Sequence, residues 1–560
     1  MAQAFAHPLK CWAALLSAAA LVACGTPPRP VQLPSPVEAP VAQPAPAPSV
    51  PYVDAVAARF PDPNVNYSTP AFEPGRTDFT TQAELHALLR GLVREGGVPS
   101  VHLLNLGASQ NGLPLEALLF TRNADASPAA LLRAGRPTVL LVGQQHGDEP
   151  AGSEALIVMA QELARGRLQS LLDRINVVIL PRANPDGAQA SQRVTANGID
   201  ANRDHLLLNT PEAQAQARLV RDYQPAVIVD AHEYTVVGRY LQKFGTVQRY
   251  DALVQYAMTA NMPAFVTKAS EEWFRQPLLA SLKKQGLSAE WYYTTSMDLE
   301  DKKLSMGGTQ PDTGRNVNGL KNAVSILIET RGVGIGRMHL KRRVHTHVTA
   351  ITSVLHSAAD RGADLLKLRQ YVEAELSAQA CQGRAVVEAG PTPTEYTVQM
   401  LDPVTGADKP LTVNWDSALV LRDIKVRNRP CGYWLAADQG DAVLKLRMLG
   451  VRVEKVTGTG VMQGETYTET SRQQGARQDV RGTIADAGSV VRVEVQTAPA
   501  LVDAPLGSYY VPLSQPLANL VMAALEPDTQ NSYFANRIIS AVGKEARVMA
   551  LPGMKMVVMP

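Results

Sequence analysis

The stretch Thr138-Val-Leu-Leu-Val-Gly-Gln-Gln-His-Gly-Asp-Glu-Pro-Ala-Gly152 determines the fold expected for this chain. Its first five residues form an apolar run that predicts a buried strand, and Ser153 to Leu163 has the pattern of a helix. Strand, loop and helix in this order are typical of open α/β sheets, which carry their sites at the carboxyl ends of the strands. His146 and Glu149 lie in the loop, where an imidazole and a carboxylate could reach one cation.

Two further apolar runs also end on a residue that could bind or catalyse. Residues 226–230 continue directly into His232 and Glu233, and residues 324–328 continue into Glu329. A third run, Ile175 to Leu180, predicts another buried strand. Packing alone gives a buried strand end no reason to carry His or Glu. The repetition therefore indicates a functional site along one edge of a sheet.

The segments around these strands supply local structure and two more motifs. Thr81 and Glu84 have the spacing of a capping box, so we expect a helix near residues 81–95. Residues 101–106 and 113–120 are typical of a hairpin. Asn184-Pro-Asp-Gly187 is a turn sequence, and Asn202-Arg203 follows further along the chain.

Taken in order, these motifs resemble those of the zinc metallocarboxypeptidases of the carboxypeptidase A type, the funnelins. The resemblance spans roughly residues 75–375. It implies an α/β fold with a mixed, mostly parallel sheet flanked by helices. It also implies one Zn²⁺ per chain, held by His146, Glu149 and His232. Two imidazoles and one carboxylate leave zinc with an open position, which is the pattern of a catalytic site.

The resemblance gives Glu329 the role of general base, which takes a proton from water and delivers it to the leaving amine. The alternative is a buried carboxylate at a strand end that pairs with Arg331. The family's pair that binds the substrate's terminal carboxylate corresponds to Asn202 and Arg203, and an arginine suits this task because its planar fork can bond both oxygens. Arg193 matches by order the arginine that polarises the scissile carbonyl, although Arg182 lies close by.

Two departures from the family leave the substrate open. Residues 300–328 contain no tyrosine where pancreatic-type members place a mobile one, and Tyr292 and Tyr293 are the nearest. The interval from Glu149 to His232 is closer to that of amide-cleaving bacterial and deacylase branches. Besides a carboxypeptidase, the chain could therefore be an amidase of cell-wall (murein) peptides or a deacylase of N-acyl amino acids. A lipoprotein that binds peptides without hydrolysing them is the alternative outside the enzyme class.

The first residues predict export rather than structure. Lys10 precedes a short apolar segment, Trp12 to Ala20, which is too short to span a bilayer. The following Leu21-Val-Ala-Cys24 resembles a bacterial lipobox, which implies a signal peptide over residues 1–23 and a lipid on Cys24; an unmodified signal peptide is the alternative. The residue after Cys24 is Gly25, whereas lipoproteins retained in the inner membrane often have Asp at this position. We therefore expect a periplasmic protein held at the outer membrane by its lipid alone.

The remaining chain divides by composition. Residues 24–65 include a proline-rich tether, residues 66–380 hold the catalytic domain, and residues 385–560 read as a β-rich accessory domain. Cys381 and Cys431 could pair in an oxidising compartment or remain two buried thiols.

The charge balance bears on the partners. The 560 residues carry 54 basic and 52 acidic side chains, a net charge of +2, which gives no case for nucleic acid. A peptide or muropeptide is the expected substrate. The sequence does not determine the oligomeric state.

Overall fold

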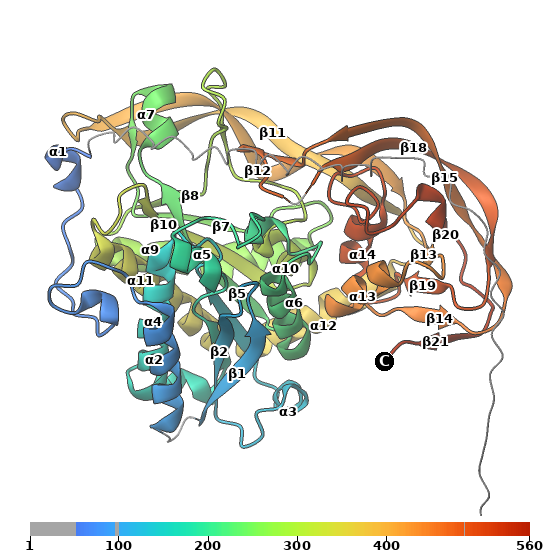
Figure 1. Cartoon of the computed structure of the whole chain (residues 1–560), viewed down its shortest axis with the longest axis horizontal. Helices are drawn as coiled ribbons and strands as arrows, with labels where there is room; N and C mark the ends of the chain where they lie inside the picture. Colours follow the sequence, from blue (N-terminus) through green and yellow to red (C-terminus); the bar gives the residue numbers. More distant parts are fainter. Residues whose placement is uncertain (1–51, 96–99, 487) are drawn as a thin grey trace, which may run out of the picture. The chain divides into compact units, whose positions relative to one another are not determined.

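The N-terminal region is built on an eight-stranded sheet. In this computed structural model, which describes residues 52–95, 100–486 and 488–560, the strands follow the order β1-β2-β4-β3-β5-β10-β7-β8 (Figure 1). The four central strands are mutually parallel, whereas β1, β2 and β7 join their inner neighbours antiparallel. The predicted mixed, mostly parallel sheet is confirmed. The strands are β1 (Ser100–Ala108), β2 (Pro114–Thr121), β3 (Thr138–Gly143), β4 (Asn176–Leu180), β5 (Val227–Thr235), β7 (Ala252–Tyr256), β8 (Ala289–Trp291) and β10 (Val324–Val333).

Helices cover both faces of this sheet. Alternate residues of β3 point to opposite faces, so Val139 and Leu141 pack with helices α4 (Pro150–Arg165) and α11 (Leu340–Asp360). Leu140 and Val142 pack on the other side with α6 (Pro211–Tyr223). Because both faces are covered, the central strands are apolar along their whole length. The predicted first helix is α2 (Gln82–Arg94), and Thr81 and Glu84 form its capping box.

Strands β5 and β10 extend further than the apolar runs indicated. Both continue beyond the end of those runs, because the parallel ladder goes on pairing, with His232 opposite Glu329 and Tyr234 opposite Arg331. The functional candidates therefore lie inside the ladder rather than in loops after it. Backbone hydrogen bonds on both sides hold them in place.

Beyond residue 384 the chain is β-rich, as expected. The long hairpin of β11 (Arg384–Leu401) and β12 (Asp408–Asn428) joins the two-residue strands β6 (Val247–Gln248) and β9 (Leu304–Ser305) in a four-stranded sheet. A seven-stranded antiparallel sheet follows in the order β18-β15-β20-β13-β19-β14-β21. Its strands are β13 (Gly432–Leu435), β14 (Glu454–Val456), β15 (Gly460–Gly475), β18 (Val490–Ala504), β19 (Tyr509–Pro512), β20 (Glu545–Val548) and β21 (Met556–Val558).

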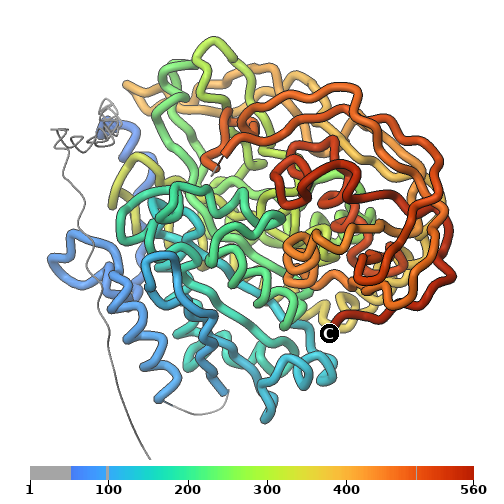
Figure 2. The backbone as a smooth tube through the Cα atoms, turned by 45° about the vertical axis from the view of Figure 1, so that its right-hand side comes forward, coloured from blue at the N-terminus to red at the C-terminus, as the bar shows by residue number. Residues whose placement is uncertain are grey.

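The C-terminal strands share a core with the N-terminal region. Residues 50–560 form one compact unit. Within it, Leu206 and Leu320 pack in one apolar cluster with Leu513 and Tyr533, and the tyrosine hydroxyl donates to the Leu206 carbonyl at 3.2 Å. The orange and red tube of Figure 2 traces the C-terminal part of this unit. The β-rich region is thus packed directly on the elements that carry the predicted motifs.

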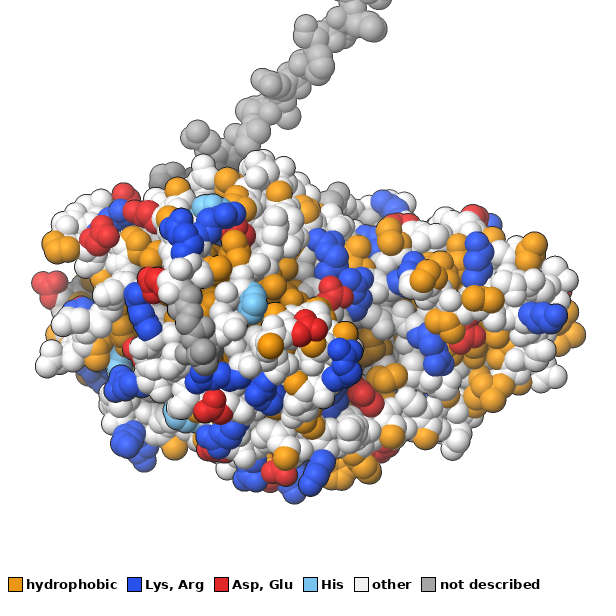
Figure 3. All heavy atoms as spheres, turned by 90° about the horizontal axis from the view of Figure 1, so that it is seen from below, with side chains coloured by type: hydrophobic (Ala, Val, Ile, Leu, Met, Phe, Trp, Pro, Cys, Tyr) orange, Lys and Arg blue, Asp and Glu red, His pale blue; other side chains and the backbone are white. Residues whose placement is uncertain are grey.

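The ends of the catalytic region show two further features. Val56 and Phe60, within the range predicted as a tether, are buried in the main core. Cys381 and Cys431 form a disulfide, so the structure has the first of the two alternatives. Cys24 and the signal peptide lie outside the described residues. No helix among the residues described is long and apolar enough to cross a bilayer. On the face drawn in Figure 3, basic and acidic side chains are interspersed.

A buried carboxyl group in β20 makes the stability of this unit depend on pH. Glu545 is 1% exposed, and neither of its oxygens has a hydrogen-bond partner among the residues that the structure describes. Burial, and then the nearby charges of Glu526 and Asp528, raise its pKa well above the ordinary value. The folded protein therefore keeps this proton while the unfolded chain releases it near pH 4 to 5. Stability from this group is present below that pH and is lost as the pH rises.

We expect Glu545→Gln to raise the free energy of unfolding at pH 8 and to change it little at pH 4.5. Urea unfolding at both pH values measures the difference. The exposed Asp503→Asn serves as the control and should show no such pH dependence. An equal effect of Glu545→Gln at both pH values would contradict the assignment.

Candidate metal centre

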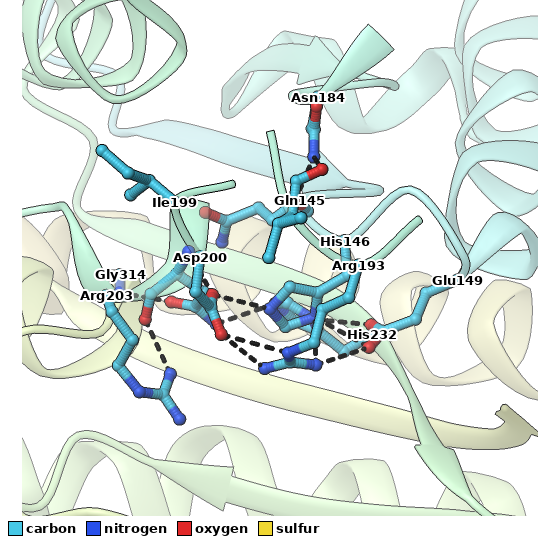
Figure 4. A network of polar contacts seen from close by, with 12 residues as sticks. Gln145, His146, Glu149, Asn184, Arg193, Ile199, Asp200, Arg203, His232 and Gly314 are labelled. Carbon is cyan, nitrogen blue, oxygen red and sulfur yellow. Dashed lines mark hydrogen bonds and ion pairs between the residues drawn. The ribbon is translucent and has the colours of Figure 1, made fainter. Parts of the chain in front are cut away.

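Three side chains from neighbouring elements converge at the carboxyl edge of the main sheet. His146 lies in the loop after β3, Glu149 caps the start of α4, and His232 lies in β5. The Glu149 carboxylate is 2.7 Å from Nδ1 of His146 and 2.8 Å from Nδ1 of His232. All three are buried, and Figure 4 shows their contacts meeting at one point. The structure thus brings together the three predicted ligands.

The conformation of the loop that carries His146 depends on a glycine and on a residue with positive φ. Gln144 has a positive φ of 50°, which turns the chain sharply after β3. A Cβ at Gly147 would lie 1.9 Å from the carbonyl carbon of Gly187, so no other residue fits there without a shift. Pro150 then starts α4 immediately after Glu149. This tight turn brings both side chains to the same edge.

The donor set fits a divalent cation. The two Nδ1 atoms lie only 3.1 Å apart, beside a carboxylate. The Nε2 atom of His146 faces Asp200 at 3.1 Å, and that of His232 faces Asp230 at 2.8 Å. A proton shared between each Nε2 and its carboxylate leaves both Nδ1 lone pairs directed at each other, which a bound cation stabilises. Nitrogen and oxygen ligands of this kind suit zinc.

Asp200 is a site residue that the sequence reasoning did not assign. It precedes a short turn of 3₁₀ helix, Ala201–Arg203, and its carboxylate also pairs with Arg193 at 2.9 Å. Burial opposes its ionisation, but Arg193 and His146 hold its pKa well below the ordinary value. Its place two residues before Asn202 was the available signal. Asp200 therefore orients His146 as a fixed anion.

Asp230 performs the same task for His232 through a longer chain of contacts. Gln145 donates to the Asp230 carboxylate at 2.7 Å, and its own side-chain oxygen lies 2.7 Å from Nε2 of His205. Burial lowers the pKa of His205 to about 4, so this imidazole is neutral at pH 7 and can donate to Gln145. Asp230 ends one of the apolar runs of the sequence, two residues before His232, but the sequence alone does not establish its role.

Glu329 lies opposite His232 in the sheet and faces the same pocket. In the described part of the chain its carboxylate makes no hydrogen bond or ion pair. Burial, and then the charge of Glu149, raise its pKa to about 7. Arg331 turns away and donates to Tyr52 at 2.9 Å and to the Gln248 carbonyl at 3.2 Å. The strand-end pair of Glu329 with Arg331, one of the two predicted alternatives, is therefore absent.

The structure also separates the two candidate arginines. Arg193 lines the pocket, where its guanidinium lies 3.4 Å from Glu149 and 3.1 Å from Nδ1 of His146. Arg182 instead donates to Gln144 and to the Thr80 carbonyl, each at 2.7 Å. Of the two, only Arg193 lines the pocket together with His146, Glu149 and Glu329.

Asn202 and Arg203 both border the pocket, but neither is free. The Asn202 amide nitrogen lies 3.1 Å from Nε2 of His232. Arg203 donates from Nη2 and Nε to one oxygen of Asp479, at 2.6 and 3.0 Å, and from Nη1 to the Asn202 carbonyl at 2.7 Å. Asp479 belongs to the C-terminal region, 276 residues away. Sequence spacing gave no indication of this partner.

Other residues complete the pocket wall. Tyr292 lines it, and burial and the charge of Glu329 raise its pKa. Tyr293 is 1% exposed and packs edge-on against Tyr240 in the core. Arg239, Arg315 and Arg481 line the same pocket. Of the two tyrosines named from the sequence, Tyr292 is therefore the one whose pKa is raised by the charge of the candidate base, Glu329.

Comparison with known proteins agrees with this geometry. A family model described as zinc carboxypeptidase matches residues 96–341. Carboxypeptidase 2 of Trichophyton equinum is 26% identical over 473 residues, which cover 84% of this chain and 86% of that protein. Carboxypeptidase D of Homo sapiens is 29% identical over 244 residues, or 35% of this chain and 18% of that protein.

Among solved structures, a metallo-carboxypeptidase from Pseudomonas aeruginosa is 19% identical, with a TM-score of 0.37 over 50% of this chain and 68% of that one. The family match covers the segment that holds His146, Glu149, His232 and Glu329. Residues 96–341 therefore match the model of the zinc carboxypeptidase family, and the protein is a metallopeptidase.

Proposed function

We propose that this protein is a zinc-dependent metallocarboxypeptidase that hydrolyses a peptide bond close to a free carboxylate. The observation that carries the proposal is the convergence of His146, Glu149 and His232, with Glu329 opposite His232 in the sheet and facing the pocket that His146 and Glu149 line. A protein that only binds a metal ion does not require a general base such as Glu329. The relatives that are named carboxypeptidases support the same activity.

His146, Glu149 and His232 would hold the zinc ion. Zinc, when bound, supplies Lewis acidity that lowers the pKa of a water from about 15.7 toward 7 and polarises the scissile carbonyl. Glu329 accepts the proton that water loses and returns it to the leaving amine. A pKa near neutrality suits a group that must both take and give a proton.

Arg193 supplies the positive charge for the substrate oxygen. Its guanidinium is 27% exposed, so it keeps access to the pocket while Asp200 holds it in place. As the carbonyl carbon becomes tetrahedral, negative charge grows on the oxygen, and a prepositioned cation stabilises it. Asn202 lies next to His232 and borders the space where the substrate must enter.

The cellular place of the enzyme is a separate proposal. We infer from the lipobox-like Leu21 to Cys24 that the chain is exported, lipidated on Cys24 and held in the periplasm, at the outer membrane. Ordinary peptides and muropeptides are both available substrates there. An amidase of murein peptides is therefore the second candidate function, and an N-acyl amino acid deacylase the third.

A Cys24→Ser variant tests this location. We expect the wild-type chain, expressed in a Gram-negative host, to incorporate radiolabelled palmitate and to sediment with membranes. The variant should lose the label and become soluble. Cys381→Ser, which removes a disulfide cysteine instead, should keep the label. Absence of label from the wild-type chain would contradict lipidation.

Glu329→Gln tests the proposed reaction. The amide cannot accept the water proton, so we expect kcat/KM to fall by about 10³-fold while the zinc content stays at one ion per chain. The exposed Glu395→Gln serves as the matched control and should retain activity. Peptides with free C-termini, their amidated forms, muropeptides and N-acyl amino acids are compared. Loss of turnover on amidation supports the carboxypeptidase, and turnover of muropeptides alone would replace it by the amidase.

Asp200→Asn tests how the ligands are positioned. Replacing the carboxylate removes the anion that orients His146, so we expect zinc affinity to fall by about 10- to 100-fold. Competition with a chromogenic chelator measures the affinity, and Asp503→Asn is the control. An unchanged zinc affinity in a correctly folded variant would remove Asp200 from the site.

A further inference from the structure

A small hairpin of the C-terminal region forms part of the wall of the catalytic pocket. It comprises β16 (Gln478–Asp479) and β17 (Gly482–Thr483), and Val480 and Arg481 at its tip line the pocket with Glu329. We call residues 477–485 the pocket hairpin. This segment lies outside residues 96–341, which the family model matches.

The pocket hairpin is anchored on catalytic elements at several points. Arg477 is 1% exposed and donates to the Arg203 carbonyl at 2.9 Å. The Ala485 carbonyl accepts from the backbone N–H of Asp200 at 2.9 Å, and the Arg481 carbonyl accepts from the Met297 N–H at 3.0 Å. The hairpin is therefore held as a wall of the pocket rather than lying loosely over it.

Asp479 neutralises the arginine expected to bind the substrate's carboxylate. One of its oxygens accepts two bonds from Arg203, and the other accepts the backbone N–H of Arg481 at 2.7 Å. The pair is buried, with 10% and 8% of the two side chains exposed. Arg203 can still offer single N–H groups, but its charge is already balanced.

Three other guanidinium groups in the pocket have no carboxylate partner among the described residues. Arg239 donates to the Thr295 carbonyl at 2.8 Å, and Arg315 donates to the Gly308 carbonyl at 3.1 Å. The guanidinium of Arg481 makes no hydrogen bond or ion pair within residues 52–95, 100–486 and 488–560, and the side chain is only partly buried. The pocket therefore carries three guanidinium groups that form no ion pair with any described residue.

Of the acidic groups that line the same pocket, Glu149 and Glu233 are engaged elsewhere and Glu329 is reserved for the reaction, whereas Oδ1 of Asp148 has no hydrogen-bond partner among the described residues. Glu149 lies between the two histidines, and Glu233 pairs with Arg343 at 2.7 Å. The neighbouring charge of Arg193, followed by burial, lowers the pKa of Arg481 to about 10, as expected for a cation among cations. An anion placed beside Arg481 would relieve this repulsion.

We propose that Arg481 and Arg315 bind the side-chain carboxylate of an acidic C-terminal residue, so that the pocket hairpin sets the substrate class of the enzyme. This inference rests on the proposed function. A substrate with a neutral last side chain brings one carboxylate, which Asn202 and the free N–H groups of Arg203 can meet. The additional guanidinium groups match a second carboxylate, as glutamate or aspartate supplies.

The experiment compares peptides that differ only in a C-terminal Glu or Gln, with a Leu-ended peptide as reference. We expect the zinc-loaded enzyme to prefer Glu over Gln in kcat/KM by about 30-fold, the worth of a charge-assisted bond. Arg481→Gln should abolish most of this preference, and Arg481→Lys should keep part of it. Arg452→Gln, an exposed arginine of the same region, is the control and should keep the full preference.

Two kinetic outcomes would overturn the inference. One is equal hydrolysis of Glu- and Gln-ended peptides by the wild-type enzyme, and the other is an equal loss on both peptides in Arg481→Gln. Failure to hydrolyse any peptide would instead count against the proposed function. Binding is therefore also measured by calorimetry in the Glu329→Gln background, where Arg481→Gln should weaken the Glu-ended peptide at least tenfold more than the Gln-ended one. If Arg481→Gln weakened the binding of both peptides equally, the inference would be wrong, even if the enzyme turned over neither peptide.

Discussion

The carboxylate of Glu149, held between the imidazoles of His146 and His232, is the interaction on which the site depends. Buried charged groups are costly unless each one is paired. The sheet meets this requirement by placing β3 beside β5, so that the loop after one strand faces a side chain within the other. Asp200 and Asp230 then satisfy the outer nitrogens of the two rings. Removing any one of these partners leaves another buried group unsatisfied.

The same constraint links the C-terminal region to the site. Asp200 orients a ligand through its side chain, while its backbone N–H bonds the Ala485 carbonyl. Arg203, one residue after Asn202, is held from the other side by Asp479. The β-rich region therefore supports the metal ligands and the substrate pocket together. A shared apolar core around Leu206 and Tyr533 is consistent with this, because the pocket wall must not move relative to the sheet.

Local sequence predicted those parts of the site that local structure creates. His146 and Glu149 lie in one continuous strand, loop and helix. The apolar run before His146 and the helical pattern after Glu149 predicted this local structure. Choosing Arg193 over Arg182 required the fold, since the two lie close in sequence but bond to different neighbours. The ion pair of Arg203 with Asp479 joins residues 276 positions apart. Hydrophobic periodicity and motif spacing do not predict contacts between residues so far apart in sequence. The part that the pocket hairpin plays in the pocket wall could therefore be recognised only from the structure.

Glu329 shows how stability and chemistry oppose each other in this pocket. A buried carboxyl group without a partner destabilises the fold, and Arg331, two residues further along β10, could have neutralised it. Tyr52 and the Gln248 carbonyl hold the Arg331 side chain instead, and the ring of Phe60 covers its guanidinium at 3.4 Å. The N-terminal segment that carries Tyr52 and Phe60 thus keeps the cation away from the base. A group that must exchange a proton near neutral pH is left free to do so.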